Sequence, residues 1–262
     1  MKSTLPPPAT AAWLTSRPIA HRGLHDRAGG VIENSMNAAR SAIAGGYGIE
    51  CDVQDSVDGE AFVFHDHDLG RLTGGDGAFC ECSARMIDDL RLSDADGDAR
   101  IPRLADFLNL VGGKVPLVVE IKSRFDGNPA LTGRCIALLR DYDGPVCVKS
   151  FDPQVVAWLR RDAPQIMRGI VADAAGSGPP GPGSNAGEAA TSARHARAHL
   201  LHIGETLPDF VSWHASDLPH AAPFLCRSLR GMPVLTWTLR SAEQAAFVRA
   251  HADQIVFEGF RP

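Results

Sequence analysis

Long apolar runs and runs of lysine or arginine are both missing from this sequence. The N-terminal stretch MKSTLPPPATAAWLTSRP has a lysine near its start, but no extended hydrophobic segment follows it and three consecutive prolines interrupt it. We therefore expect no signal peptide, no membrane-spanning helix and no stable membrane anchor. The net charge of −5 argues against nucleic acid as the main partner, because a nucleic-acid-binding face needs an excess of basic residues.

Cysteine is sparse and shows no pattern of structural pairs. The six cysteines are scattered along a chain of 262 residues, which is long enough to fold without disulfides. Cys80 and Cys82 are separated by one residue rather than two, and no second cysteine or histidine pair lies nearby, which disfavours zinc. The cysteine pattern predicts reduced thiols in a cytoplasmic protein.

Several well-known functional motifs are also absent. Gly112-Gly113-Lys114 is followed by valine, so it is no P-loop, and no G-x-S-x-G segment occurs. The acidic segment 94–98 resembles the start of an EF-hand, but its glycine comes two places early and Ala105 occupies the twelfth position. We interpret it as an acidic surface turn.

Short apolar runs alternate with amphipathic stretches along the chain. The length suits one (β/α)8 barrel, which typically needs about 250 residues, and the alternation favours a parallel sheet. No dinucleotide fingerprint supports an open doubly wound sheet, so the sequence predicts a single TIM barrel domain over residues 1–262. The candidate strands are 18–21, 48–53, 61–65, 117–122, 146–150, 167–171, 210–214 and 234–237, and the candidate helices are 35–44, 104–111, 131–141, 154–162, 221–230 and 242–251.

One segment departs from this alternation. Residues 173–191 are rich in Gly, Pro, Ser and Ala, a composition typical of a flexible loop. Because the segment follows the sixth candidate strand, we predict a mobile lid on the catalytic face of the barrel. An inert insertion is the plainer alternative. A domain boundary is disfavoured, since the remaining chain holds only the last two candidate strands.

Charged side chains interrupt two otherwise apolar candidate strands. Glu50 and Asp52 are two residues apart and therefore face the same way in a strand, as do Glu120 and Lys122. Like charges inside a barrel are unfavourable unless a cation lies between them. Three carboxylates suit a hard cation such as Mg²⁺ or Ca²⁺. Each acid alone could be a solvated strand end or an arginine partner, but polar pairs on two hydrophobic strands favour a metal site.

Two histidines directly follow short apolar strands, where the catalytic rim of a barrel lies. His21 and His65 could serve as general acid and base, because imidazole titrates near neutrality. Arg22 offers a planar fork for phosphate oxygens, and Gly23 permits a tight turn. A lone histidine is more often structural than catalytic, and His67 is a rival to His65.

The order of these motifs resembles the glycerophosphodiester phosphodiesterase family. The family's pattern is H-R-G, E-N-T, E-x-D, D-G and H-D with a following L-x-R-T, then I-P-x-L, E-x-K, S-F-D and W-T-V. Each piece is weak alone, but the ordered combination is specific and extends over residues 18–262. The matching segments are HRG at 21–23, ENS at 33–35, ECD at 50–52, DG at 58–59, HDHDLGRLT at 65–73, IPRL at 101–104, EIK at 120–122, SFD at 150–152 and WTL at 237–239.

The resemblance implies a (β/α)8 barrel with one divalent metal ion, Mg²⁺ or Ca²⁺, at its mouth. It places His65 rather than His67 at the first position of H-D. Asn34 also fits a helix N-cap. Glu33 could contact the residues that bind the metal or the substrate without binding either itself. By motif position, the metal ligands are Glu50, Asp52 and Glu120, the acid/base pair is His21 and His65, the phosphate-binding residues are Arg22 and Lys122, and Trp237 lines the substrate pocket.

Two departures from the family pattern concern the substrate. Phe257 and Glu258 stand where Thr and Asp are expected, and Arg240 stands where Asn often follows W-T-V. Strand alternation puts Phe257 and Glu258 on opposite faces. An inward Glu258 would favour a cationic alcohol such as choline, and an inward Phe257 a more apolar one. The indole N–H of Trp237 could also donate a hydrogen bond to the substrate.

The expected activity is metal-dependent hydrolysis of a small, water-soluble glycerophosphodiester to glycerol 3-phosphate and an alcohol. One alternative is a related enzyme that acts on lysophospholipid or sphingolipid head groups. Another is a barrel that binds phosphorylated ligands without turnover, although binding alone does not require two histidines.

Overall fold

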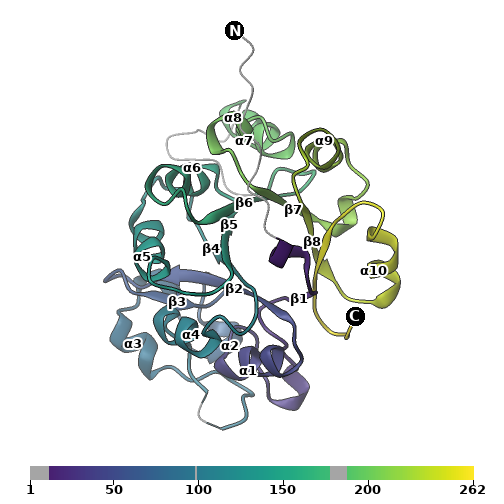
Figure 1. The fold of residues 1–262 in the computed structure, drawn as a ribbon. Coiled ribbons are helices and arrows are strands. Elements are labelled where there is room, and N and C mark those ends of the chain that lie inside the picture. The colour runs from purple at the N-terminus through teal and green to yellow at the C-terminus, as the bar shows by residue number, and fades with distance from the viewer. Residues whose placement is uncertain (1–11, 98, 178–187) are drawn as a thin grey trace. The chain divides into compact units, whose positions relative to one another are not determined.

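The computed structural model describes residues 12–97, 99–177 and 188–262. The chain divides into two compact units. The N-terminal unit comprises residues 17–122 and 130–146, and the C-terminal unit comprises residues 123–129 and 147–262 together with the first described residues up to 16. Figure 1 labels the elements of both. A single domain over 1–262 stays a prediction.

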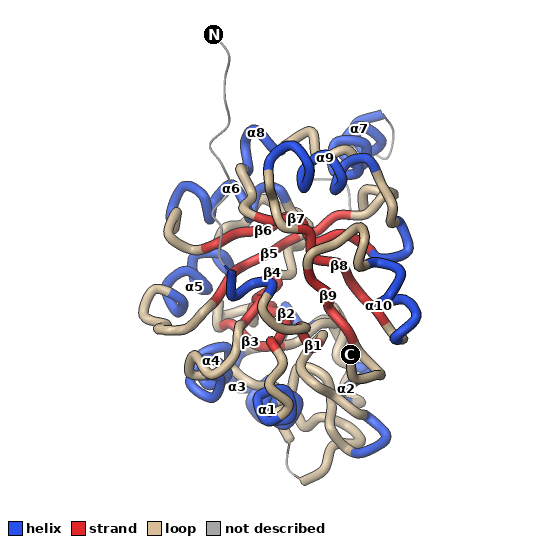
Figure 2. The backbone as a smooth tube through the Cα atoms, turned by 45° about the vertical axis from the view of Figure 1, so that its right-hand side comes forward, coloured by secondary structure: helices blue, strands red, loops and turns tan. Residues whose placement is uncertain are grey.

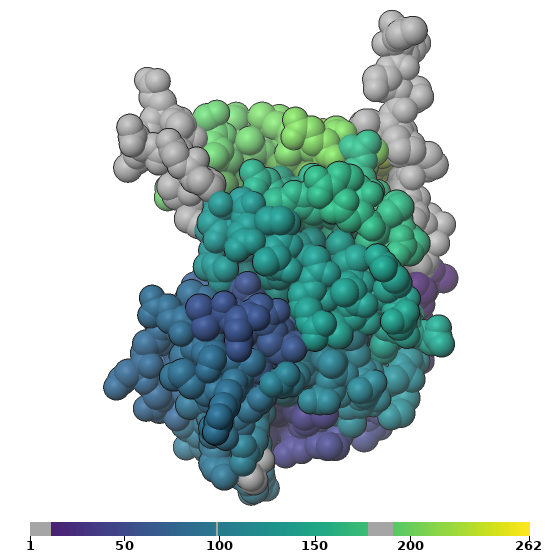
Figure 3. Space-filling model, turned by 90° about the vertical axis from the view of Figure 1, so that its left-hand side faces the viewer, coloured from purple at the N-terminus to yellow at the C-terminus, as the bar shows by residue number. Residues whose placement is uncertain are grey.

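The N-terminal unit is built around the long strand β2, which pairs in parallel with β1 and β4 and in antiparallel with β3. Helix α1 packs against β2 and α4. Figure 3 shows the closely packed surface that the blue and teal segments of this unit form on one face. The elements are β1 (Ile19–Ala20), β2 (Gly48–Asp55), β3 (Ala61–Val63), β4 (Leu117–Ile121), α1 (Met36–Ala44), α2 (Gly70–Thr73), α3 (Ala84–Asp89), α4 (Leu104–Val111) and α5 (Ala130–Leu139).

Burial on both faces explains the apolar character of the central strands. Every residue of β2 and of β4 is buried, as expected for parallel strands covered on both sides. Polar residues at such positions must find partners inside the unit. The charged residues of β2 and β4 are therefore the exceptions that need a functional explanation.

The C-terminal unit contains a run of parallel strands from β5 to β9, each paired with the next. Helices α6, α9 and α10 pack against the strands, as Figure 2 shows. The elements are β5 (Val146–Ser150), α6 (Pro153–Asp162), β6 (Met167–Ala172), α7 (Glu188–Ala198), α8 (Ile203–Thr206), β7 (Phe210–His214), α9 (Ala221–Arg230), β8 (Val234–Leu239), α10 (Ala242–Val248) and β9 (Gln254–Phe257).

One predicted barrel strand was assigned wrongly. The segment predicted as a strand over 61–65 forms β3, which pairs antiparallel with β2 and so is not a barrel strand. Only residues 56–60 connect the two strands, which is too short for the crossover that parallel strands require. The eighth parallel strand in the described part of the chain is β9, which the sequence prediction omitted, so that three strands rather than two follow 173–191.

The predicted lid over 173–191 lies largely outside the described residues. Its last residues belong to α7, which starts at Glu188. Its first residues form a turn in which the Asp173 carboxylate accepts from the Ser177 N–H at 3.0 Å. Among the described residues, no helix combines the length and the apolar character needed to cross a membrane.

Candidate active site

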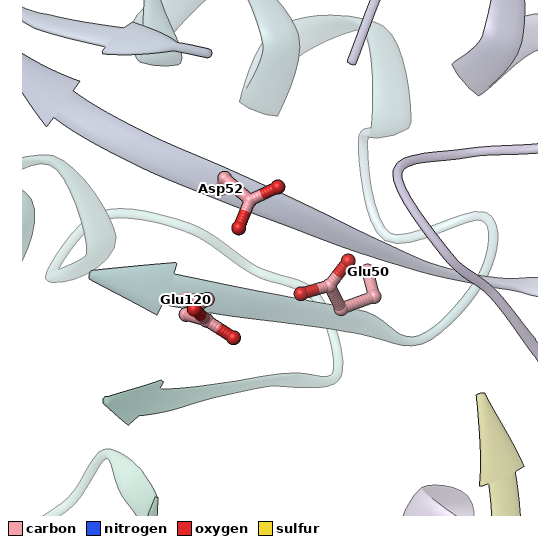
Figure 4. A group of neighbouring side chains, drawn as sticks. All are labelled: Glu50, Asp52 and Glu120. Atoms are coloured by element: carbon pink, nitrogen blue, oxygen red, sulfur yellow. The ribbon is translucent and has the colours of Figure 1, made fainter. Parts of the chain in front are cut away.

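Three buried carboxylates lie together on β2 and β4. Asp52 is the cross-strand partner of Glu120, and Glu50 precedes Asp52 by two residues, so all three side chains share one face. Figure 4 shows them on the adjacent strands. One oxygen of each lies within 4.8 Å of the others, so the group could hold a metal ion. The strand-parity prediction for these residues agrees with this geometry.

Two cations neutralise part of this cluster. Lys122 Nζ lies 3.2 Å from Glu120 Oε1 and 3.7 Å from Asp52 Oδ1, and Arg22 Nε lies 3.2 Å from Asp52 Oδ2. Burial alone would raise the pKa of Asp52, but Lys122, His65 and Arg22 hold that pKa well below its usual range. Burial alone would lower the pKa of Lys122, but Glu120 and Asp52 raise it. The carboxylate therefore stays ionised and the lysine stays protonated.

The turn after β1 brings His21 and Arg22 to the cluster. The backbone N–H of Arg22 donates to Glu50 Oε2 at 3.1 Å, and His21 Nε2 lies 4.0 Å from the same oxygen. Gly23 has φ +79°, and a Cβ there would come within 2.8 Å of Ala38. Only glycine combines this backbone conformation with such close approach. The H-R-G spacing is thus fixed by packing against α1 as well as by chemistry.

Asn34 supports the cluster rather than capping a helix. The N-cap of α1 is Ser35, whose hydroxyl accepts from Ala38 N–H, so the alternative of Asn34 as N-cap is wrong. Asn34 adopts φ +56°, and its side-chain amide donates to Asp52 Oδ2 at 3.0 Å while its Oδ1 accepts from Asp52 N–H at 3.2 Å. The amide therefore fixes the orientation of the Asp52 carboxylate.

His65 is held on two sides. Its Nδ1 lies 2.8 Å from Asp66 Oδ1. Gln54, on the same face of β2 as Asp52, donates to the carbonyl oxygens of Phe64 and Asp66 at 3.1 and 2.7 Å. The ring of the preceding Phe64 stacks on Phe79 at 4.9 Å within a buried apolar cluster. The backbone around His65 is therefore anchored before any ligand binds.

His65 lines a cavity of about 390 Å³ to which Lys122 and Arg71 also contribute. His67 lines the cavity too, but its side chain is exposed and its backbone carbonyl accepts from Phe79 N–H at 2.8 Å. The cavity thus places the predicted acid/base residue beside the predicted phosphate-binding lysine.

The charges around the cluster fit a divalent cation. Within the described residues, the connected network holds five carboxylates and three arginine or lysine cations, an excess of two negative charges. A hard divalent ion prefers such oxygen ligands and would balance that excess. The carboxylates are Glu33, Glu50, Asp52, Asp66 and Glu120, and the cations are Arg22, Arg71 and Lys122.

Trp237 belongs to the C-terminal unit and is described within it. Its indole N–H donates to the Ser212 carbonyl oxygen at 3.1 Å, so the expectation that this N–H serves a substrate is wrong for the described conformation. The ring lies in T-shaped contact with the rings of Phe151 and His214, whose centroids are 5.5 and 4.9 Å from its own.

The two unusual C-terminal residues also have partners in this unit. Phe257 is fully buried, and Glu258 Oε1 lies 2.7 Å from Arg240 Nη2.

A sequence profile described as the Glycerophosphoryl diester phosphodiesterase family matches residues 21–256. The chain belongs to this family. It is 31% identical over 161 residues to a glycerophosphodiester phosphodiesterase of Caldanaerobacter subterraneus, which covers 58% of this chain and 65% of that protein. It is 27% identical over 162 residues to glycerophosphodiester phosphodiesterase 1 of Rattus norvegicus, covering 58% of this chain and 47% of that protein. The matches thus span between about half and two thirds of these relatives.

Solved structures establish the fold of this family member. An Oleispira antarctica phosphodiesterase, solved in complex with the product sn-glycerol-3-phosphate, has a TM-score of 0.73 at 20% identity and covers 93% of this chain and 92% of that one. A glycerophosphodiester phosphodiesterase of Thermotoga maritima has a TM-score of 0.66 at 23% identity, covering 91% and 92%. The predicted (β/α)8 barrel fold is confirmed.

Sequence reasoning left three residues of the N-terminal site without a role. Asp66 and Arg71 stand inside the HDHDLGRLT segment, and Gln54 follows the acidic pair of β2 by one strand period. Parity could have placed Gln54 on the metal face. The pairing of Arg71 joins positions 38 residues apart, which no local pattern reveals.

Proposed function

We propose that this protein hydrolyses glycerophosphodiesters to glycerol 3-phosphate and an alcohol, with one Mg²⁺ or Ca²⁺ held by Glu50, Asp52 and Glu120. The observation that carries the proposal is the buried carboxylate triad, which Lys122, Arg22 and His21 contact directly. Lys122 also lines a cavity together with His65. Family membership and the likeness to a phosphodiesterase solved with sn-glycerol-3-phosphate support it.

The side chains of the chain itself supply most of the proposed chemistry. Arg22 and Lys122 bind the phosphoryl oxygens and stabilise the charge that develops on them. A divalent ion at the triad would add positive charge beside the same oxygens. Because Asp52 stays ionised and Lys122 protonated, this electrostatic arrangement is present before the substrate binds.

His21 and His65 divide the proton transfers. One histidine removes the proton from the attacking hydroxyl, which belongs to water or to the neighbouring glycerol carbon, and its oxygen forms a bond to phosphorus. Attack by the glycerol hydroxyl gives a cyclic phosphate, which a water molecule then opens to glycerol 3-phosphate. The phosphorus–oxygen bond to the alcohol breaks, and the other histidine protonates the departing oxygen. With Asp66 ionised beside Nδ1, the proton of neutral His65 lies on Nδ1 and Nε2 is the reacting nitrogen.

Trp237 is proposed to line the substrate pocket. This role rests on its position in the family's W-T-V motif. An indole ring can pack against glycerol carbons, and in the described conformation the N–H of Trp237 donates to the carbonyl oxygen of Ser212.

The test is product analysis on a panel of phosphodiesters, after removal of metal and after addition of Mg²⁺ or Ca²⁺. Glycerophosphocholine, glycerophosphoethanolamine, lysophosphatidylcholine and bis-p-nitrophenyl phosphate make up the panel. Release of glycerol 3-phosphate from either of the first two supports the proposal. Turnover of the lysolipid alone favours the lipid-acting alternative, and no turnover with either Mg²⁺ or Ca²⁺ contradicts the proposed hydrolysis and favours the non-catalytic alternative.

A further inference from the structure

Arg71, in the short helix α2, contacts two different carboxylates at once. Its Nη1 and Nη2 donate to the two oxygens of Glu33, each at 2.8 Å. Its Nε and Nη2 donate to the two oxygens of Asp66, the latter at 2.9 Å. All three nitrogens of the guanidinium are thus engaged, in the planar geometry that arginine offers and lysine lacks.

Each carboxylate also contacts a residue of the proposed active site. Glu33 Oε1 also accepts from Arg22 Nη1, and Asp66 Oδ1 is the partner of His65 Nδ1. Burial alone would raise the pKa of both acids, but hydrogen bonds with Arg71, with Arg22 at Glu33 and with His65 at Asp66, hold each at about 2. Both acids are therefore ionised at neutral pH.

The backbone that carries Arg71 is fixed although its side chain is 42% exposed. Leu69 and Leu72, on either side of it, are buried in the apolar cluster that also holds Phe64 and Phe79. The same cluster therefore anchors Arg71 and the residue that precedes His65. An exposed arginine on a fixed helix, bridging two carboxylates, is suited to setting positions rather than to stabilising the fold.

We propose that Arg71 is a positioning residue that fixes Arg22 and His65 relative to each other. This inference rests on the proposed function, because it assigns Arg22 to phosphate binding and His65 to proton transfer. Arg71 contacts Glu33 and Asp66, which in turn contact Arg22 and His65. Without Arg71, two adjacent carboxylates repel each other and His65 loses the fixed partner of its Nδ1.

The test compares Arg71→Ala and Arg71→Lys with a matched control. Arg134 is 37% exposed and binds Glu60 through two nitrogens in the same unit, at a cluster of Arg103 and Glu60 outside the proposed site. We expect Arg71→Ala to lower kcat by about 10- to 100-fold, the scale of a misplaced catalytic group. Arg71→Lys keeps the charge but loses the planar fork, so it should not restore the rate. Arg134→Ala should stay within about twofold of the wild type, since the proposal gives Arg134 no part in positioning.

Nitrogen-15 NMR of the side chain of His65, assigned with His65→Ala, gives a readout that does not depend on turnover. The wild type and Arg134→Ala should carry the proton on Nδ1, whereas Arg71→Ala should show a mixture of tautomers. Thermal unfolding of all variants identifies any that fail to fold, and Arg71→Lys then replaces Arg71→Ala in both measurements.

The outcomes separate the two proposals. A wild-type protein that hydrolyses no diester overturns the proposed function, while the His65 spectrum still decides the positioning role. An active wild type with normal kcat in Arg71→Ala, or an unchanged His65 spectrum in that variant, overturns the role of Arg71 alone. Full activity in Arg71→Lys shows that charge suffices and refutes the planar bridge.

Discussion

The tight turn at Gly23 makes a quantitative prediction for Gly23→Ala. The left-handed φ of +79° costs an alanine about 1–2 kcal/mol. The added Cβ would also lie 2.8 Å from both the Cβ and the carbonyl carbon of Ala38. Because Ala38 belongs to α1, relief requires a backbone shift, which typically costs about 1–3 kcal/mol. The expected loss of unfolding free energy is about 2–5 kcal/mol.

Gly59 provides the matched control. Its φ of +83° is nearly the same, but no atom lies within 4 Å of the position that a Cβ would take. Gly59→Ala should therefore cost only the conformational part, about 1–2 kcal/mol. Alanine reduces the entropy of the unfolded chain equally at both sites. The difference between the two variants isolates the collision with α1, about 1–3 kcal/mol.

Urea unfolding measures this difference, and kcat measures its consequence for the site. A shifted turn displaces Arg22 N–H from Glu50 and moves His21, so Gly23→Ala should also lose activity by about 100-fold. Gly59→Ala should keep its activity. Equal stability and equal activity in the two variants would refute the argument that packing against α1 sets the H-R-G turn.

Three further predictions concern metal, acid/base chemistry and pH. Chelation should abolish turnover and Mg²⁺ or Ca²⁺ should restore it; full activity in excess chelator would exclude the metal site. His21→Ala and His65→Ala should each lose about 10²–10⁴-fold in kcat, and His67→Ala should stay near wild type; the reverse order for His65 and His67 would overturn the assignment. The pKa of Glu33 is held at about 2 in the folded state, so its ionisation contributes up to about 3 kcal/mol above its unfolded pKa of about 4.5. The stability difference between wild type and Glu33→Gln should be constant above that pH and shrink as pH falls toward 2; a difference that does not change between pH 6 and 3 contradicts the pairing.

Strand periodicity predicted the orientation of the charged side chains on two strands of the site. Residues two apart in a strand share a face. The sequence therefore predicts that Glu50 and Asp52 point the same way on one strand, and that Glu120 and Lys122 do so on another. The cross-strand pairing of Asp52 with Glu120 could not be predicted in this way, because register depends on how β2 and β4 meet in space.

The sequence prediction took β3 for a barrel strand and missed β9, because composition does not distinguish the two kinds of strand. Residues 61–65 and 254–257 are both short apolar runs, and nothing in their composition separates a barrel strand from a hairpin strand. The length of the connection does separate them, because five residues cannot cross over between parallel strands. Connection length should therefore be weighed before apolar character.

Local backbone conformation decided the roles of Asn34 and Ser35. Both residues are good N-caps by type, so sequence alone cannot choose between them. The left-handed φ of Asn34 turns its amide toward Asp52 and leaves Ser35 to cap α1. This conformation accompanies a tertiary contact between Asn34 and the Asp52 carboxylate, which residue type alone does not reveal.

Glu258 and Arg240, which both depart from the family pattern, form an ion pair and therefore cannot be interpreted separately. From the sequence, we expected either Glu258 or Phe257 to point toward the alcohol group of the substrate. Neither alternative considered that Glu258 could pair with another residue of the chain. The carboxylate of Glu258 pairs with Arg240, the other residue that departs from the family pattern, and its backbone N–H donates to Leu239. A cationic alcohol would have to compete with a guanidinium at 2.7 Å for that carboxylate. Glu258 therefore gives no reason to favour choline while Arg240 is present, and a substitution at either position changes the charge seen by the other.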